Sequence, residues 1–230
     1  METITRKFNV AIDGPAGAGK STVARMVAKE LGFIYIDTGA MYRAITYKVL
    51  QEGLDIARPY EIIEMAKKLQ IKLIPQSWGQ QVLIDGSDVT ERLRSPEVNR
   101  LVSAISQIKE VRQLLTDIQQ QMASAKGVVM DGRDIGTSVL PDAEVKVFLS
   151  ADVKERARRR WEEIKDSQPN MTLEQLEEDI ARRDLADQQR EVSPLVRAHD
   201  AVFIDSTNMS ISEVTEHILQ LCRTIMSEAK

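Results

Sequence analysis

One short stretch constrains the fold more than any other: GPAGAGKS, residues 14–21. It is too poor in large side chains to contribute to a hydrophobic core. It follows an apolar, strand-like segment at residues 8–14 and precedes apolar residues at helical spacing that end at Gly32. A glycine-rich loop between a strand and a helix predicts backbone N–H groups that point inward and bind phosphate oxygens. The alternative is a glycine-rich turn that only leads into a helix.

The last residues of this loop suit nucleotide phosphates. Lys20 can reach the β- and γ-phosphates, and the hydroxyl of Ser21 can bind Mg²⁺. The candidate residues for binding ATP are Gly14, Pro15, Ala16, Gly17, Ala18, Gly19, Lys20, Ser21 and Thr22.

Apolar segments recur along the chain and alternate with helical sequence. Besides residues 8–14, they lie at 33–37, 127–132, 144–150 and 201–206. This alternation predicts an α/β fold with a five-stranded parallel sheet covered by helices on both faces. We expect a single domain over residues 1–230, because 230 residues suit one core and no linker is found.

Residues 60–104 have a different pattern, which predicts a small α+β insertion beside the sheet. QIKLIPQ and QQVLIDG alternate in polarity, and SWG separates them, as in a hairpin. A helix follows, with Ser95 as its cap and Pro96 in its first position.

Composition excludes several classes of protein. Hydrophobic residues make up 43% and charged residues 29%, and the net charge is −4. No apolar run approaches a membrane span, and the N-terminus lacks the features of a signal peptide. We therefore expect a cytoplasmic protein that binds neither nucleic acid nor membrane, and a monomer, since no coiled coil or repeat is found. The single cysteine, Cys222, is expected in a buried helix.

The segment IDTGAMYR, residues 36–43, ends the second predicted strand, where open α/β sheets bind ligands. Thr38 and Gly39 begin a helix and Arg43 lies one turn inside it, so a second anion could bind there. Asp37 could orient the acceptor. Equally, Asp37 or Thr38 could be a plain helix cap and Arg43 a solvated side chain.

The segment VVMDGRDIGT, residues 128–137, places charged residues after another strand. Asp131 is the candidate second group for Mg²⁺, directly or through water. Arg133 and Asp134 would face the acceptor. The same residues are also common in turns.

Two arginine-rich segments follow. ERARRRWEEIK and ARRDLADQQR could be solvated helix faces with ion pairs such as Glu155 with Arg159. Phosphoryl transfer also needs arginine, because charge spreads over the moving group. Arg183, Asp187 and Arg190 are spaced by four and three residues, so they share one helix face and can converge on one ligand. Between the two segments, Thr172 and Gln175 can form a capping box.

The motifs IDGPAGAGKST, DTGAMYR, SAISQIKEVR, MDGRDIGT and RRDLADQQREVSPL, in this order, resemble those of the bacterial cytidylate kinases, which are nucleoside monophosphate kinases. The resemblance covers nearly the whole chain. It implies the phosphate-loop fold of those kinases, and transfer of the γ-phosphoryl group of ATP to CMP or dCMP with Mg²⁺.

The resemblance also implies roles for particular residues. The segment 154–170 would be a lid over ATP, and the insertion 60–104 would hold the acceptor. Ser103, Arg112 and Asp134 would contact the cytosine. The expected catalytic residues are Lys20, Arg133, Arg158, Arg183 and Arg190. The expected acceptor-binding residues are Asp37, Thr38, Gly39, Arg43, Ser103, Arg112, Arg133, Asp134, Arg183, Asp187 and Arg190.

Two alternatives stay open on the sequence. The first is a kinase of the same fold with another small acceptor, such as UMP or shikimate. The second is a nucleotide-dependent switch, which would hydrolyse ATP slowly whatever acceptor is present.

Overall fold

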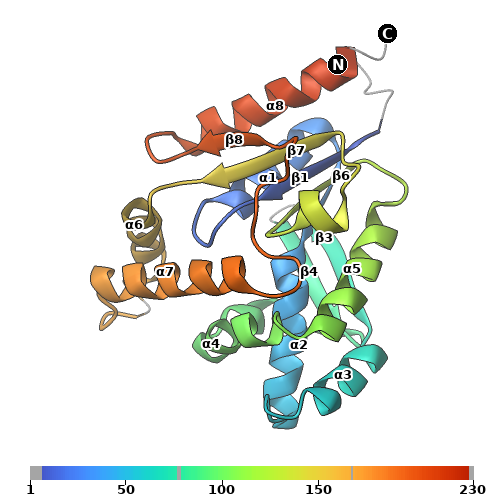
Figure 1. Ribbon diagram of the computed structural model, residues 1–230, viewed down its shortest axis with the longest axis vertical. Coiled ribbons are helices and arrows are strands. Elements are labelled where there is room, and N and C mark those ends of the chain that lie inside the picture. The colour runs from blue at the N-terminus through green and yellow to red at the C-terminus, as the bar shows by residue number, and fades with distance from the viewer. Residues whose placement is uncertain (1–6, 77–78, 167, 228–230) are drawn as a thin grey trace.

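The computed structural model describes residues 7–76, 79–166 and 168–227, and its core is a five-stranded parallel sheet (Figure 1). The strand order is β2-β6-β1-β7-β8, and every neighbouring pair is parallel. The strands are β1 (Asn9–Asp13), β2 (Ile34–Asp37), β6 (Val128–Gly132), β7 (Val145–Ser150) and β8 (Val202–Asp205). All five apolar segments of the sequence are therefore strands, and the predicted fold class is confirmed.

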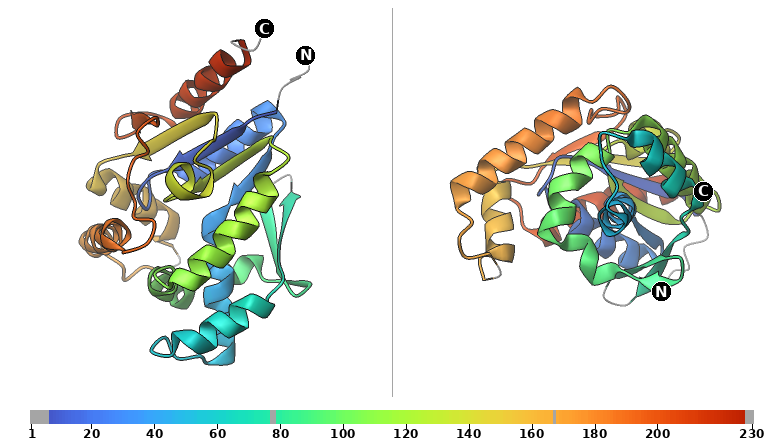
Figure 2. Two further views of the ribbon diagram at one scale, coloured as in Figure 1. Left: turned by 45° about the vertical axis from the view of Figure 1, so that its right-hand side comes forward. Right: turned by 90° about the horizontal axis from the view of Figure 1, so that it is seen from below.

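Helices cover both faces of this sheet (Figure 2). Because side chains alternate along a strand, Val10 and Ile12 of β1 pack towards α1 and α8, whereas Ala11 packs on the other face near α5. Cys222 of α8 is buried in the first of these layers, as predicted. None of the helices, within the described residues, is long and apolar enough to cross a membrane. The helices are α1 (Lys20–Leu31), α2 (Thr38–Glu52), α3 (Pro59–Lys68), α4 (Pro96–Ile105), α5 (Lys109–Ala123), α6 (Val153–Ile164), α7 (Leu173–Gln189) and α8 (Ile211–Ser227).

Local signals set several helix ends. Gly32 and Gly53 end α1 and α2 in the left-handed conformation, with φ of 66° and 64°. The Ser95 side chain accepts a hydrogen bond at the start of α4, and Thr172 and Gln175 form the predicted capping box of α7.

The insertion forms a separate antiparallel sheet of β3 (Ile71–Gln76), β4 (Gly79–Ile84) and β5 (Ser87–Asp88). The predicted hairpin is present, β5 adds a short third strand, and a 3-10 turn, η1 (Thr90–Arg94), leads to α4. Two residues of the predicted turn, Ser77 and Trp78, lie outside the described residues.

Gln80 joins this small sheet to the free edge of β2. Its side-chain amide donates to the carbonyl of Tyr35 and accepts from the N–H of Asp37, at 2.8 and 3.1 Å. These are backbone groups that an edge strand leaves unpaired, so the contact fixes the insertion beside the strand end that carries the predicted acceptor residues Asp37 and Thr38.

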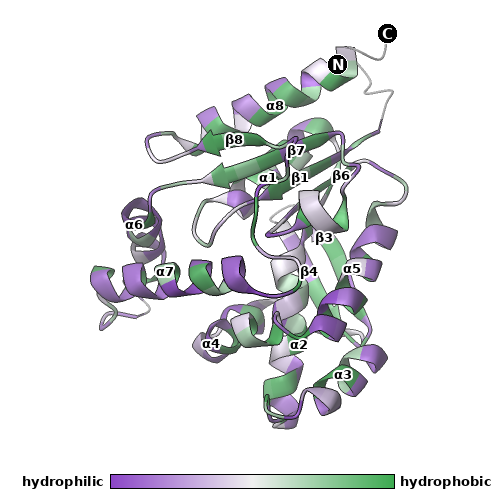
Figure 3. Cartoon of the chain, in the orientation of Figure 1, coloured by the Kyte–Doolittle hydropathy of each residue, from purple (hydrophilic) through white to green (hydrophobic). Residues whose placement is uncertain are grey.

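Helices α6 and α7 form a hairpin that extends from one side of the sheet (Figures 1 and 2). Figure 3 shows the central strands as mostly hydrophobic and α7 as mostly hydrophilic. The hairpin has a small apolar core of its own, formed by Ala157, Ile164, Leu176 and Ile180.

Candidate active site

The glycine-rich stretch forms the predicted loop between β1 and α1. A Cβ at Gly14 would lie 1.9 Å from the carbonyl oxygen of Leu149, and Gly19 has φ of 87°, so both positions require glycine. The ammonium of Lys20 is buried and donates to the carbonyl of Pro15 at 2.7 Å. Burial, together with nearby Arg133, lowers the pKa of Lys20 well below its usual value. A polyanion bound in the loop would stabilise this charged ammonium.

Asp131, at the end of β6, connects the loop to the neighbouring strand. Its two carboxylate oxygens accept hydrogen bonds of 2.9 Å from the hydroxyls of Ser21 and Tyr35. Thr38 donates to the Asp131 carbonyl at 2.7 Å. Burial, and then the charge of Asp37, raises the pKa of Asp131 to about 6. The structure thus brings together Ser21 and Asp131, the two residues predicted to bind Mg²⁺.

Three half-buried arginines lie around the next part of the site: Arg43 of α2, Arg133 after β6, and Arg183 of α7. The Nε atoms of Arg43 and Arg183 are buried without a hydrogen-bond partner among the described residues, and neither side chain makes an ion pair there. Burial lowers the pKa of Arg183 to about 9, and the charges of Arg133 and Arg43 add to this effect. Such an excess of positive charge is suited to a phosphate group.

A buried ionic network continues from these arginines. Arg133 pairs with Asp187 at 2.9 Å, and Arg190 lies within 3.7 Å of Asp187 and 3.5 Å of Asp134. Asp134 also pairs with Arg112, whose guanidinium lies 5.3 Å from the centre of the Tyr42 ring. The contacts from Arg133 through Asp187, Arg190 and Asp134 to Arg112 thus form one continuous path of charged side chains. Arg133, at one end of this path, is close enough to Lys20 to lower the pKa of its ammonium.

Other predicted acceptor residues lie beside this path. Asp37 caps α2, because its carboxylate accepts from the N–H of Ala40 at 2.9 Å, so the plain capping role is present. A Cβ on Gly39 would lie 2.9 Å from a guanidinium nitrogen of Arg43, so glycine leaves room for that side chain. Ser103 is half-buried in α4, and its carbonyl accepts from the hydroxyl of Ser106. Their roles towards a ligand stay predictions.

Arg158 is not brought together with the other candidates. It is exposed on α6 and makes two hydrogen bonds of 2.8 Å to Glu155. Glu155 also pairs with Arg159, as the sequence predicted. The α6 side chain that does reach the phosphate loop is Arg156, which is buried and donates to the carbonyl of Ala16.

The sequence reasoning missed Asp13, the last residue of β1. Its carboxylate accepts from the N–H groups of Ile135 and Gly136, at 2.8 and 2.7 Å, and so holds η2 (Ile135–Val139), the turn that follows Asp134. Burial raises the pKa of Asp13 to about 6. Its position at the end of a buried strand was the available signal.

Tyr35 and Asp184 were missed as well, and Arg156 was noted only as one arginine of the segment ERARRRWEEIK. Tyr35 has the alternating pattern of an ordinary strand residue, and Arg156 and Asp184 look like members of a solvated charge run. No local signal distinguishes them.

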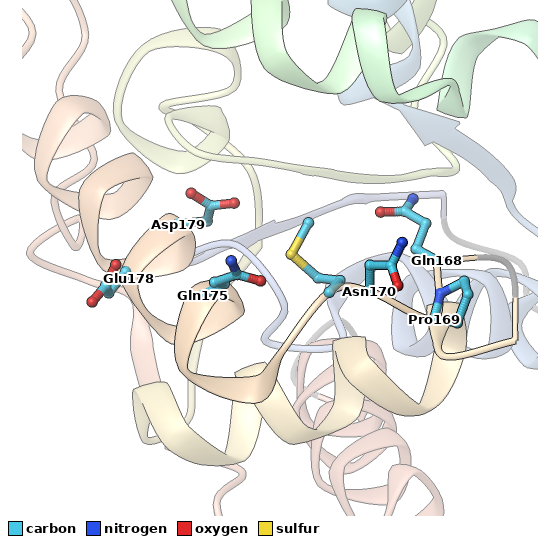
Figure 4. Close-up of a pocket in the computed structure, with 7 residues that line it drawn as sticks. Gln168, Pro169, Asn170, Gln175, Glu178 and Asp179 are labelled. Atoms are coloured by element: carbon cyan, nitrogen blue, oxygen red, sulfur yellow. The ribbon is translucent and has the colours of Figure 1, made fainter.

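A shallow hollow of about 580 Å³ lies at the connection of α6 and α7, lined by Gln175, Glu178 and Asp179 of α7 and by residues 168–171 (Figure 4). Its charged lining residues are acidic. This hollow is therefore a poor fit for phosphate, in contrast to the basic path next to Lys20.

The fold and these contacts define a nucleotide-binding protein with a phosphate loop, beside which a cluster of arginines is gathered. The chain belongs to the cytidylate kinase family, whose model matches residues 10–224. The cytidylate kinase of Caldicellulosiruptor saccharolyticus is 51% identical over 216 residues, which cover 94% of this chain and 96% of the relative. That of Bacillus subtilis is 52% identical over 215 residues, with coverage of 94% and 96%.

Among solved structures, an uncharacterized protein from Eubacterium ventriosum has a TM-score of 0.52 and 11% identity. The similarity spans 95% of this chain and 99% of that protein, and it shows a shared fold alone.

Proposed function

We propose that the protein transfers the γ-phosphoryl group of ATP to CMP, and also to dCMP, giving CDP or dCDP and ADP. Family membership over nearly the whole chain supports this reaction. The structural observation that carries it is the buried pair of Arg112 and Asp134, which lies at one end of the ionic path whose other end is Arg133. An acceptor nucleotide can then place its phosphate at the arginines near Lys20 and its base at this pair.

The pair can distinguish cytosine from uracil. Cytosine offers the N4 amino group as a donor, beside acceptors at N3 and O2, so Asp134 can accept from it and Arg112 can donate to it. Uracil offers O4 and N3–H and leaves these groups mismatched. An unpaired buried polar group costs about 1 to 3 kcal/mol, so CMP should be preferred over UMP by about tenfold or more.

The residues around Asp131 suit Mg²⁺. The hydroxyl of Ser21 and the carboxylate of Asp131 are adjacent hard oxygen ligands, and Mg²⁺ characteristically takes one or two carboxylates together with substrate phosphates. When bound, Mg²⁺ would neutralise charge on the donor phosphates. The loop from Gly14 to Thr22 would hold these phosphates through its backbone and Lys20.

The reaction needs alignment more than proton transfer, because the attacking atom is an oxygen of the acceptor phosphate. Arg43 and Arg133 would hold that phosphate, and Arg183 and Arg190 would offset the charge that spreads over the transferred group. We propose that the segment 154–170, with Arg158, closes over ATP and excludes water, and that the insertion 60–104 binds the acceptor. We propose that the enzyme acts as a monomer in the cytoplasm, as expected from the sequence, in which no coiled coil, repeat or signal peptide is found.

The test is an acceptor panel. The protein is incubated with ATP, Mg²⁺ and, separately, CMP, dCMP, UMP, AMP, GMP and shikimate, and the products are separated by anion-exchange chromatography. We expect CDP and dCDP as the main products. A preference for UMP would overturn the assignment of Arg112 and Asp134, and ATP hydrolysis that ignores the acceptor would favour the switch.

A matched pair of variants tests the base contact. Asp134→Asn should lower the ratio of kcat/KM for CMP over UMP by about tenfold or more, because a carboxylate that accepts from N4 is lost. Asp142→Asn, an exposed carboxylate eight residues further on, should leave this ratio unchanged.

A further inference from the structure

Side chains from α6 and α7 hold one residue of the phosphate loop. The N–H of Ala16 donates to one carboxylate oxygen of Asp184 at 3.1 Å, and the carbonyl of Ala16 accepts from Arg156 at 2.8 Å. Arg156 and Asp184 also pair with each other at 2.5 Å. Both backbone polar groups of one loop residue, Ala16, are therefore held by one ion pair.

This ion pair is buried and closely packed. The side chains of Arg156 and Asp184 are 8% and 11% exposed. Arg156 additionally donates through Nε to the carbonyl of Ala151, just before α6. A Cβ at Gly17 would lie 3.2 Å from the Cβ of Arg156, so the loop lies directly against the helix at this point. These contacts leave the pair little freedom to change partners.

The position of the α6–α7 hairpin depends on polar contacts of this kind. The apolar cluster of the hairpin is formed by its own residues, so the hairpin does not share the core of the central sheet. Arg159 anchors α6 to the end of β8 through two hydrogen bonds to Ser206. Asp184 of α7 contacts the phosphate loop at Ala16, and this hydrogen bond helps to fix the position of α7 relative to the loop.

The same helix carries proposed acceptor residues on either side of Asp184. Arg183 precedes it and Asp187 follows three residues later, where it pairs with Arg133. A helix moves as a unit, so a shift of the phosphate loop that moves Asp184 also moves Arg183 and Asp187.

We infer that Arg156 and Asp184 are positioning residues that couple the donor loop to the acceptor site through α7. This inference rests on the proposed function. When a triphosphate binds, it fixes the loop and, through Ala16 and Asp184, fixes α7 in the orientation that presents Arg183 and Asp187 to CMP. Binding of either nucleotide then raises the affinity for the other by the same factor.

The test is calorimetry with two ligands. Binding of CMP is measured with and without a saturating ATP analogue whose β–γ bridge cannot be hydrolysed. We expect the analogue to tighten CMP binding to the wild-type protein, within the range of about 5- to 150-fold that is typical of coupled sites. In Asp184→Asn the two ligands should still bind. The coupling factor, which is the ratio of the CMP affinities with and without the analogue, should fall by about threefold or more.

Asp179→Asn is the matched control. It removes the same charge from the same helix at an exposed position that pairs with Arg182, and its coupling factor should equal that of the wild type. Arg156→Lys keeps the positive charge but cannot reach Ala151, Ala16 and Asp184 together. Arg156→Lys should also lower the coupling factor, and the test uses this variant if Asp184→Asn does not fold.

Failure of this inference and failure of the proposed function would give different results. A coupling factor that is the same in both variants as in the wild type would overturn the inference and leave the proposed function intact. A wild-type protein that binds the analogue but not CMP would overturn the proposed function, and the inference with it.

Discussion

Arg133 donates a hydrogen bond through Nε to Asp187 at 2.9 Å, which joins the loop after β6 to α7. Burial favours the neutral form of Asp187, but the charges of Arg133, Arg183 and Arg190 outweigh it and hold the pKa of Asp187 below its usual value. One carboxylate therefore pairs with Arg133 and Arg190, which would otherwise repel each other, and offsets the nearby charge of Arg183.

Replacing Asp187 should displace the arginines that pair with it. We expect Asp187→Asn to lower kcat/KM for CMP by about 10²-fold, because misplacement by about 1 Å has that effect on aligned groups. Steady-state kinetics check the change, with Asp179→Asn as the control on the same helix. Unaltered kinetics in the Asp187 variant would show that Asp187 does not set the arginine positions.

Lys20 should matter for turnover and not for folding. In Lys20→Ala we expect kcat to fall by about 10³-fold, since a cation at the transferred phosphoryl group is removed. Thermal stability should not fall, because burial disfavours the charged lysine, as its lowered pKa indicates. A coupled assay of ADP release and a melting curve measure the two effects. The exposed Lys29 of α1 supplies the control, Lys29→Ala, and an active Lys20→Ala variant would remove Lys20 from the mechanism.

Asp131 should determine the requirement for Mg²⁺. Asp131→Asn should raise the Mg²⁺ concentration needed for half-maximal activity by about 10- to 100-fold, and Tyr35→Phe, which removes one hydrogen bond to Asp131, should raise it less. A Mg²⁺ titration of the ADP-release rate measures this. Asp117→Asn, at an exposed position of α5, serves as the control. Equal Mg²⁺ dependence in the Asp131 variant and the wild type would exclude Asp131 from the metal site.

Asp13 should give a measurable pH dependence of stability. Its pKa is raised from 3.8 to about 6 by burial, so between these pH values the folded protein binds more protons than the unfolded chain. The contribution of Asp13 to the free energy of unfolding is therefore fully present below about pH 4 and is lost as the pH rises through 6. The shift corresponds to about 3 kcal/mol.

The test compares urea unfolding of the wild type and Asp13→Asn from pH 4 to 7. We expect the stability of the wild type relative to the variant to decrease by up to about 3 kcal/mol across this range, because contributions from other carboxylates cancel in the difference. A difference that does not vary with pH would show that Asp13 is ionised throughout.

Most of the fold could be predicted because its signals are local. The five strands follow from apolar segments, and the ends of α1, α2, α4 and α7 follow from glycines and capping residues a few positions away. The short strand β5 could not be predicted, because two residues carry too little pattern and their pairing with β4 forms only in the folded chain.

The candidate site could be predicted where residues follow strands. Lys20, Ser21, Asp131 and Arg133 all lie just after the carboxyl ends of parallel strands, or on the last strand residues, and such ends meet at one edge. The sequence reasoning placed Arg158, and not Arg156, among the catalytic candidates, although both belong to one charged helix and no local pattern separates them. Only packing shows that Arg156 faces the phosphate loop and Arg158 faces solvent.

The sequence by itself determined the strand–loop–helix phosphate site, the alternation of strands and helices, and the membership of a family, since each depends on residues close together in the chain or on the chain as a whole. Only the tertiary structure decided that Asp13 holds the turn at residues 135–136, that Arg112 pairs with Asp134, and that Asp184 binds Ala16 across 168 residues. The physical reason is that such contacts depend on the strand order and on the direction in which each buried side chain points. Both are set by the packing of the whole core.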